Sequence, residues 1–274
     1  MGGRKLMCQY GPVFYQLSLW KEGARKALKD MGQHVTLARR RQREELPVIV
    51  KGHRSPVLRR LAGVDMALQK NKETNLGLAL SQIDGLVVAP GETFSFWALA
   101  GAPTARRGYR EGLVIANGDL RRGVGGGLCQ LANLIHYLVL HSPMEVAELH
   151  HHSDALFPDD RRRVPFGTGT SIFYPHVDYR FRNTTDQPVQ LRLWLSEGDL
   201  CGELRSERPF PCRYRLVEED AHFVNEGEAY YRVSRVYRRV IHRESGRELG
   251  RELLLRNHSR VLYDPALIPP DQLR

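Results

Sequence analysis

The amino-acid sequence predicts an α+β fold, because three stretches of the chain differ in their apolar pattern. Helical spacing dominates the first part, short apolar runs between turn signals follow, and strand-like alternation dominates the last part. We therefore expect a basic helical segment over residues 1–70, a mixed α/β core with antiparallel strands over residues 71–205, and a β-rich hairpin extension over residues 206–274.

The N-terminal segment reads as helical. Apolar side chains recur at three- and four-residue spacings within residues 12–45, with basic residues between them. Gly32 is expected to end or interrupt this helix, and the arginine-rich stretch beyond it is expected to form a second one. Prolines and a glycine within residues 47–56 predict a loop, and residues 57–83 predict another helix.

The middle of the chain combines short strands with one helix. The apolar run at residues 86–88 and the aromatic run at 93–97 are expected to be strands or ordered loops. A further strand is expected at residues 113–115, where the turn signal Asn117-Gly118 predicts a hairpin. Apolar residues over 128–139 fall on one face of a helix.

Two hairpins are predicted from alternating apolar and polar residues. The first covers residues 171–196, with residues 183–186 as its connection. The second pairs residues 229–242 with residues 251–263 around a turn-like tip. Together they predict antiparallel sheet in the second half of the chain.

The net charge of +10 belongs to the N-terminal segment. Residues 1–70 hold 15 Lys and Arg against 5 Asp and Glu, and the rest of the chain is balanced. Such a segment suits an anionic surface such as phospholipid or an anionic polymer, although a solvated basic helix face is the simpler interpretation. Zinc-finger spacing and RNA-binding signatures are missing, so we expect no nucleic acid partner.

The sequence lacks an apolar run of about 18 residues and the apolar core of a signal peptide, so we expect a cytoplasmic protein. Its cysteines, at positions 8, 129, 201 and 212, have no Cys-x-x-Cys spacing. We therefore predict no structural metal site and no cofactor.

Cys129 is the strongest candidate for a chemically active residue. It follows three consecutive glycines and falls in the first turn of the expected helix, where the positive helix end would lower a thiol pKa. Backbone N–H groups of Gly126, Gly127 and Leu128 could hold an oxyanion, and Gln130 could add a hydrogen bond. The alternative is a buried cysteine beside glycines that serve tight packing.

A nucleophilic thiol needs a base, and the histidine run 150–152 lies about twenty residues downstream. Spacing does not decide which imidazole faces the sulfur. Asp154, Asp159 or Asp178 could orient the base. A zinc site built from histidines and Cys129 is a weaker alternative, because no His-x-x-x-His pair is present.

These residues stand in an ordered set of motifs that resembles the VanW family, named after an accessory protein of some vancomycin-resistance clusters. The resemblance covers about residues 70–200, and the N-terminal residues 8–12 and 15–18 also look like a stand-alone subgroup. The matching pieces are Pro90–Phe96, Gly108-Tyr109, Gly125–Gln130, His152-Ser153 and Asp178–Asn183.

The resemblance implies a bacterial protein linked to the cell envelope and an L,D-transpeptidase-like reaction. It assigns the nucleophile to Cys129 and the paired histidine to His152, with Ser153 beside it. Our leading hypothesis is cysteine-dependent acyl transfer on peptidoglycan-type peptides or precursors, with Gln130 and Asp178 in supporting roles. The alternatives are a non-catalytic module that binds a wall precursor or an envelope partner, and a zinc-dependent hydrolase.

Overall fold

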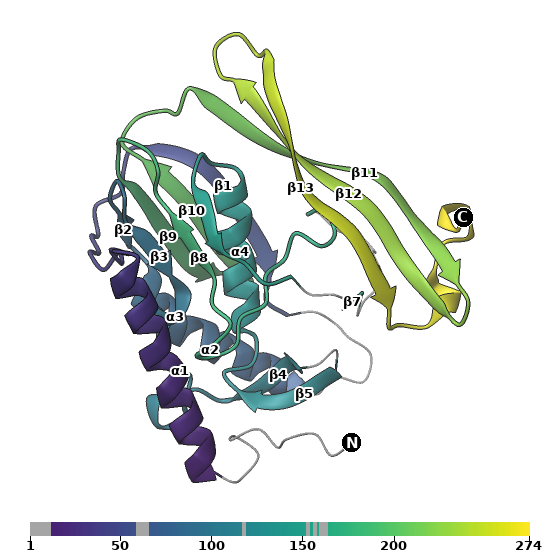
Figure 1. The fold of residues 1–274 in the computed structure, drawn as a ribbon, viewed down its shortest axis with the longest axis horizontal. Helices are drawn as coiled ribbons and strands as arrows, with labels where there is room; N and C mark the ends of the chain where they lie inside the picture. Colours follow the sequence, from purple (N-terminus) through teal and green to yellow (C-terminus); the bar gives the residue numbers. More distant parts are fainter. Residues whose placement is uncertain (1–11, 59–65, 117–118, 152–153, 156–157, 159–163) are drawn as a thin grey trace.

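A computed structural model shows an α+β architecture, as the sequence predicts (Figure 1). Helices pack on a set of small, mainly antiparallel sheets, and a long sheet formed by the C-terminal residues extends to one side. No helix among the described residues is long and apolar enough to span a bilayer. The structure describes residues 12–58, 66–116, 119–151, 154–155, 158 and 164–274.

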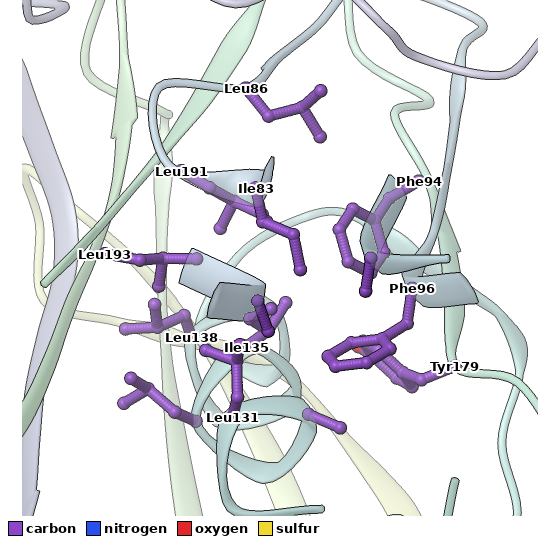
Figure 2. Close-up of a cluster of buried hydrophobic side chains, with 14 of the residues drawn as sticks. Ile83, Leu86, Phe94, Phe96, Leu131, Ile135, Leu138, Tyr179, Leu191 and Leu193 are labelled. Carbon is purple, nitrogen blue, oxygen red and sulfur yellow. The ribbon is translucent and has the colours of Figure 1, made fainter. Parts of the chain in front are cut away.

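The centre of the molecule is helix α4 (Leu128–Leu140) against a four-stranded sheet. That sheet has the order β1-β10-β9-β2 and all its pairs are antiparallel. Its strands are β1 (Val48–Pro56), β2 (Val87–Val88), β9 (Val189–Ser196) and β10 (Asp199–Ser206). Because one face of α4 is apolar, it buries that face in the main core (Figure 2).

A second, three-stranded sheet closes the other side of the core. It has the order β3-β8-β6 and is antiparallel. Its strands are β3 (Thr93–Ser95), β6 (Glu145–Glu148) and β8 (Arg180–Arg182). Ser95 ends β3 and caps the short helix α3 (Phe96–Ala100), since its side chain accepts a hydrogen bond from the Ala98 amide. Phe94 and Tyr179 from this side meet the apolar face of α4 (Figure 2).

Two helices and a hairpin flank this core. Helix α1 (Pro12–Gly32) runs along the outside of the molecule, and its end confirms the predicted break at Gly32 (Figure 1). Helix α2 (Met66–Ile83) contacts the hairpin of β4 (Glu111–Ala116) and β5 (Asp119–Val124). This hairpin confirms the one predicted at Asn117-Gly118, although the two turn residues themselves lie outside the described part.

The C-terminal residues form a separate long sheet beside the core (Figure 1). Strands β12 (Ala229–His242) and β13 (Glu248–Val261) are the predicted hairpin, and β11 (Cys212–Glu226) adds a strand that the sequence did not predict. The short strand β7 (Asp154–Ala155) runs parallel to β13. The chain ends with two single turns, η3 (Pro265–Leu267) and η4 (Pro270–Gln272).

The predictions for residues 33–56 were wrong. The arginine-rich stretch is extended, because its backbone bonds to neighbours: the Ala38 amide donates to the Thr93 carbonyl and Arg40 accepts from Val87. The expected loop is strand β1, which covers the open edge of β10. Helix propensity does not decide the structure of this stretch. A helix here would leave the neighbouring sheet edge unpaired, and the backbone N–H and C=O groups of that edge would lack hydrogen-bond partners.

The predicted hairpin over residues 171–196 was also wrong. Its second half is strand β9, but only Arg180–Arg182 of its first half form a strand, β8, and these two strands lie in different sheets. Asn183 anchors the connection between β8 and β9, because its side-chain amide donates to the Val88 and Gln187 carbonyls. Strand β9 pairs with β10 instead, through a two-residue turn at Glu197 and Gly198, both of which have positive φ.

The proposed division at residues 70 and 205 stays a prediction. Two strands pair with strands on the other side of these sequence boundaries. Strand β1 of the N-terminal segment completes the core sheet, and strand β7 of the core joins the C-terminal sheet.

Candidate functional site

The glycine run before α4 is a tight turn packed against the protein itself. Gly125 and Gly127 adopt positive φ values of 83° and 96°, which favour glycine. Gly126 lies against strand β4, where an added Cβ would come within 2.5 Å of the Gly112 Cα atom. An added Cβ at Gly125 would overlap Pro103. Packing therefore accounts for the glycines without a ligand.

Helix α2 holds this turn in place. The Asn75 side chain is fully buried and donates to the Gly126 carbonyl at 2.9 Å and the Arg110 carbonyl at 3.0 Å, while its oxygen accepts from the Arg110 amide. One turn earlier, the methylene chain of Lys72 covers Gly127. Since Lys72 and Asn75 are three residues apart, they share one face of α2. Neither residue was predicted from the sequence to be part of the site.

Cys129 lies in the first turn of α4, as predicted, and the residue is partly exposed although its sulfur atom is buried. Its Sγ atom is 3.7 Å from the Ile172 carbonyl oxygen, to which the thiol donates. The expected lowering of its pKa was wrong. Burial of the sulfur raises the pKa of Cys129, and this exceeds the opposing effects of backbone hydrogen bonds at Ile172 and Cys129 and of the Lys72 charge.

The predicted oxyanion donors immediately precede Cys129 in the sequence, but their backbone amides are not equivalent. The Gly126 amide donates to the Gly123 carbonyl at 3.3 Å, so it already has a partner within the turn. Leu128 begins α4, and its amide belongs to the first turn, where a helix supplies no carbonyl partner. Gly127 immediately precedes it as the N-cap. A role for the Gly127 and Leu128 amides as oxyanion donors stays a prediction.

Gln130 points toward strand β1. Its side-chain nitrogen donates to the Ser55 hydroxyl at 2.7 Å and the Pro56 carbonyl at 2.9 Å. Its Oε1 atom is buried and has no hydrogen-bond partner among the described residues. The amide therefore ties the start of α4 to the end of β1, which fixes the helix terminus that carries Cys129.

The first two histidines of the run, His150 and His151, contact a segment that reaches Cys129. The His150 carbonyl accepts from the Ser171 amide at 2.6 Å, and the next residue, Ile172, contacts the sulfur. His151 Nδ1 is 3.2 Å from the Gly167 carbonyl oxygen. The His150 backbone thus lies beside the segment that covers Cys129. His152 and Ser153, predicted as base and support, lie outside the described residues.

Asn133 is a polar residue near this site that was not predicted from the sequence. It lies one helical turn after Cys129, and its Oδ1 atom accepts from the Thr170 amide at 2.6 Å. The spacing of four residues from Cys129 was the available signal, because it places both side chains on one face of the helix. Cys129 and Asn133 together anchor residues 170–172 along α4.

Two further histidines, His136 in α4 and His141 at the C-cap of this helix, have structural settings. His136 is buried, and its Nδ1 atom is 3.1 Å from the Tyr179 hydroxyl. Burial, with the nearby charge of His151, lowers the pKa of His136 to about 3. Burial likewise lowers the pKa of His141 to about 4. Across the described residues, no group of three or more His, Cys, Asp and Glu side chains could hold a metal ion, so the zinc hypothesis has no ligand set there.

Asp178 has a structural setting. It is buried and accepts from the Ser95 hydroxyl at 2.6 Å and the Trp97 amide at 3.1 Å. It also pairs with Lys26 of α1 at 2.9 Å and with Arg180 at 3.2 Å. These contacts join α1 to the second sheet, and the supporting catalytic role predicted for Asp178 stays untested.

Comparison with known proteins matches residues 71–205 to the family described as VanW like protein. The chain is 31% identical over 201 residues to the "Vancomycin B-type resistance protein VanW" of Enterococcus faecalis, which covers 73% of each chain. It is 30% identical over 148 residues to the "Uncharacterized protein YoaR" of Bacillus subtilis, covering 54% of this chain and 47% of the relative. No solved structure matches the chain.

Proposed function

Because the chain belongs to the family of VanW-like proteins, we propose that it is a cysteine-dependent acyl-transfer enzyme acting on peptidoglycan-type peptides or their precursors. One arrangement supports this most: Cys129 stands in the first turn of α4, and the Ile172 carbonyl that its thiol contacts lies next to Ser171, whose amide donates to the His150 carbonyl. The name of the enterococcal relative motivates a link to glycopeptide resistance.

In the proposed reaction the Cys129 thiol transfers its proton to His152 and the thiolate attacks a peptide carbonyl. A carbon–sulfur bond forms, and the amides of Gly127 and Leu128 hold the oxyanion. The carbon–nitrogen bond then breaks as His152 returns the proton to the leaving amine. An acceptor amine in transpeptidation, or water in hydrolysis, then attacks the thioester carbonyl and loses a proton to His152. The carbon–sulfur bond breaks, and His152 returns that proton to the Cys129 sulfur. His152 enters this scheme through the family motif.

The raised pKa of Cys129 sets a condition on this reaction. In the described conformation the thiol is protonated and donates to the Ile172 carbonyl. A substrate must therefore replace that contact before attack, and the Lys72 charge then favours the thiolate. We infer that activation of the sulfur accompanies substrate binding.

The same observation favours a second candidate, a non-catalytic module that binds a wall precursor. A buried, protonated thiol behaves as a small apolar side chain and is inert. In that case Cys129 serves packing, and its replacement by alanine leaves ligand binding intact.

The two candidates separate in one experiment on the full chain. Synthetic stem peptides of the wall type are incubated with wild type, Cys129→Ala and Cys212→Ala, and products are followed by mass spectrometry. Cys212 is also partly buried and serves as the matched control. Acyl transfer predicts turnover in wild type and Cys212→Ala and loss by a factor of at least about 10³ in Cys129→Ala. Equal turnover in all three contradicts it, and binding without turnover favours the binding module.

A further inference from the structure

Helix α1 carries a stripe of apolar side chains that is exposed to solvent. Leu17, Trp20, Leu28 and Met31 lie along one side of the helix and are 46%, 76%, 69% and 73% exposed. Residues at these spacings normally form the buried face of a helix. Large apolar side chains gathered in one exposed patch mark an interaction surface, because exposing them to water is unfavourable.

Ion pairs on the opposite side of α1 fix this orientation. Lys26 forms ion pairs with Asp178 at 2.9 Å and with Glu148 at 3.2 Å. The Asp30 carboxylate accepts hydrogen bonds from both terminal guanidinium nitrogens of Arg180, each at 2.7 Å. Burial alone would lower the pKa of Arg180, but the hydrogen bonds and charges of Asp30 and Asp178 raise it, so the guanidinium stays charged. The polar side of α1 therefore faces the core.

A basic row runs beside the exposed stripe. Lys21, Arg25 and Lys29 recur every four residues and are exposed, which places them next to Leu17 and Leu28 on the helix surface. The arrangement of a wide apolar face with a Trp residue and a basic flank is that of helices that lie in a lipid interface. The charge of the flank is complementary to acidic headgroups.

We propose that α1 lies flat on an anionic phospholipid surface. Trp20, Leu28 and Met31 enter the boundary between headgroups and acyl chains, and Lys21 and Lys29 contact phosphates. The helix need not leave the core to do this, since its ion pairs lie on the other side. The core carrying Cys129 would thereby be held at a membrane surface.

The first test measures binding of the full chain to vesicles by flotation. Wild type is compared on neutral phosphatidylcholine vesicles and on vesicles that also contain phosphatidylglycerol. The double variant Trp20→Gln/Leu28→Gln removes apolar contacts, and Leu249→Gln/Leu267→Gln changes two other exposed leucines as a matched control. We expect wild type and control to bind the anionic vesicles, and the Trp20/Leu28 variant to bind them at least about tenfold more weakly.

The second test removes the basic row with Lys21→Gln/Arg25→Gln/Lys29→Gln. We expect weaker binding to anionic vesicles and loss of the dependence of wild-type binding on salt concentration. Circular dichroism checks that each variant is folded. Equal binding of wild type and variants overturns the proposal, as does failure of wild type to bind. So does a concentration-dependent dimer that Trp20→Gln/Leu28→Gln abolishes, because the stripe would then be covered by a second copy.

Discussion

Helices α1 and α4 differ in which face they bury. Both are amphipathic along their length. Helix α4 places Leu131, Ile135 and Leu138 in the core (Figure 2), whereas α1 presents Trp20 and Leu28 to the outside. An apolar period therefore identifies a helix, but partners on the rest of the chain decide its orientation. Around α4 those partners are apolar, and around α1 they are charged.

The sharpest test of this comparison removes one apolar side chain from each helix. Ile135→Ala is expected to lower the free energy of unfolding by about 4 kcal/mol, because Ile135 is completely buried. Leu28→Ala is expected to change it by about 0.5 kcal/mol or less. Urea unfolding of both variants measures the difference. Similar losses in the two variants would mean that α1 also buries its apolar stripe.

A second test breaks the ionic attachment of α1. Asp178→Asn leaves Lys26 and Arg180 without their buried carboxylate, and we expect a loss of about 3 kcal/mol with faster amide exchange along α1. The control Asp186→Asn removes an exposed carboxylate that pairs with Arg208, where we expect about 0.5 kcal/mol or less. Unchanged exchange in α1 would show that other contacts hold this helix.

The buried polar residue of α4 gives a pH test. His136 titrates at about pH 3 in the folded state, below its ordinary value of 6.5, so the unfolded chain binds the proton first as pH falls. Its contribution to stability is complete above about pH 6.5 and is lost toward pH 3, at up to about 1.4 kcal/mol per pH unit. His136→Gln should reduce this slope in urea unfolding. Identical slopes in wild type and variant would contradict a buried, neutral His136.

The smallest expected effect concerns the charge beside the start of α4. Lys72→Met removes a charge that lowers the pKa of Cys129, so alkylation of Cys129 at neutral pH should slow by about two- to threefold. Lys70→Met, on an exposed part of the same helix, is the control. Peptide mapping follows Cys129 separately from the other cysteines. An unchanged rate in Lys72→Met would show that the ammonium group does not act on the sulfur.

The sequence predicted those features that depend on local pattern. The α+β class, the break at Gly32, the β4–β5 hairpin, helix α4 and the β12–β13 hairpin were predicted correctly. Strand β1 and the partner of β9 were not, since both depend on which distant sheet edge is open. Sheet pairing between remote strands leaves no periodic signal in one sequence.

The candidate site was predicted in part for a related reason. The position of Cys129 at a helix start follows from the glycine run and the apolar period of α4. The direction in which its pKa shifts does not follow from the sequence, because the segment at Ile172 that covers the sulfur lies 43 residues away. Asn75 and Lys72 were missed for the same reason: they reach the glycine turn from a different helix.

Mass spectrometry of the intact protein and of its peptides detects an acyl-enzyme on Cys129 directly. The full chain is mixed with a wall-type stem peptide at neutral pH, quenched in acid, and digested for peptide mapping. We expect one thioester, on Cys129, in wild type and in Cys212→Ala but not in Cys129→Ala. We also expect faster blocking of Cys129 with substrate than with a simple alkylating reagent, because substrate displaces the Ile172 contact. A sulfur that stays unmodified until the protein is unfolded would contradict cysteine-dependent acyl transfer.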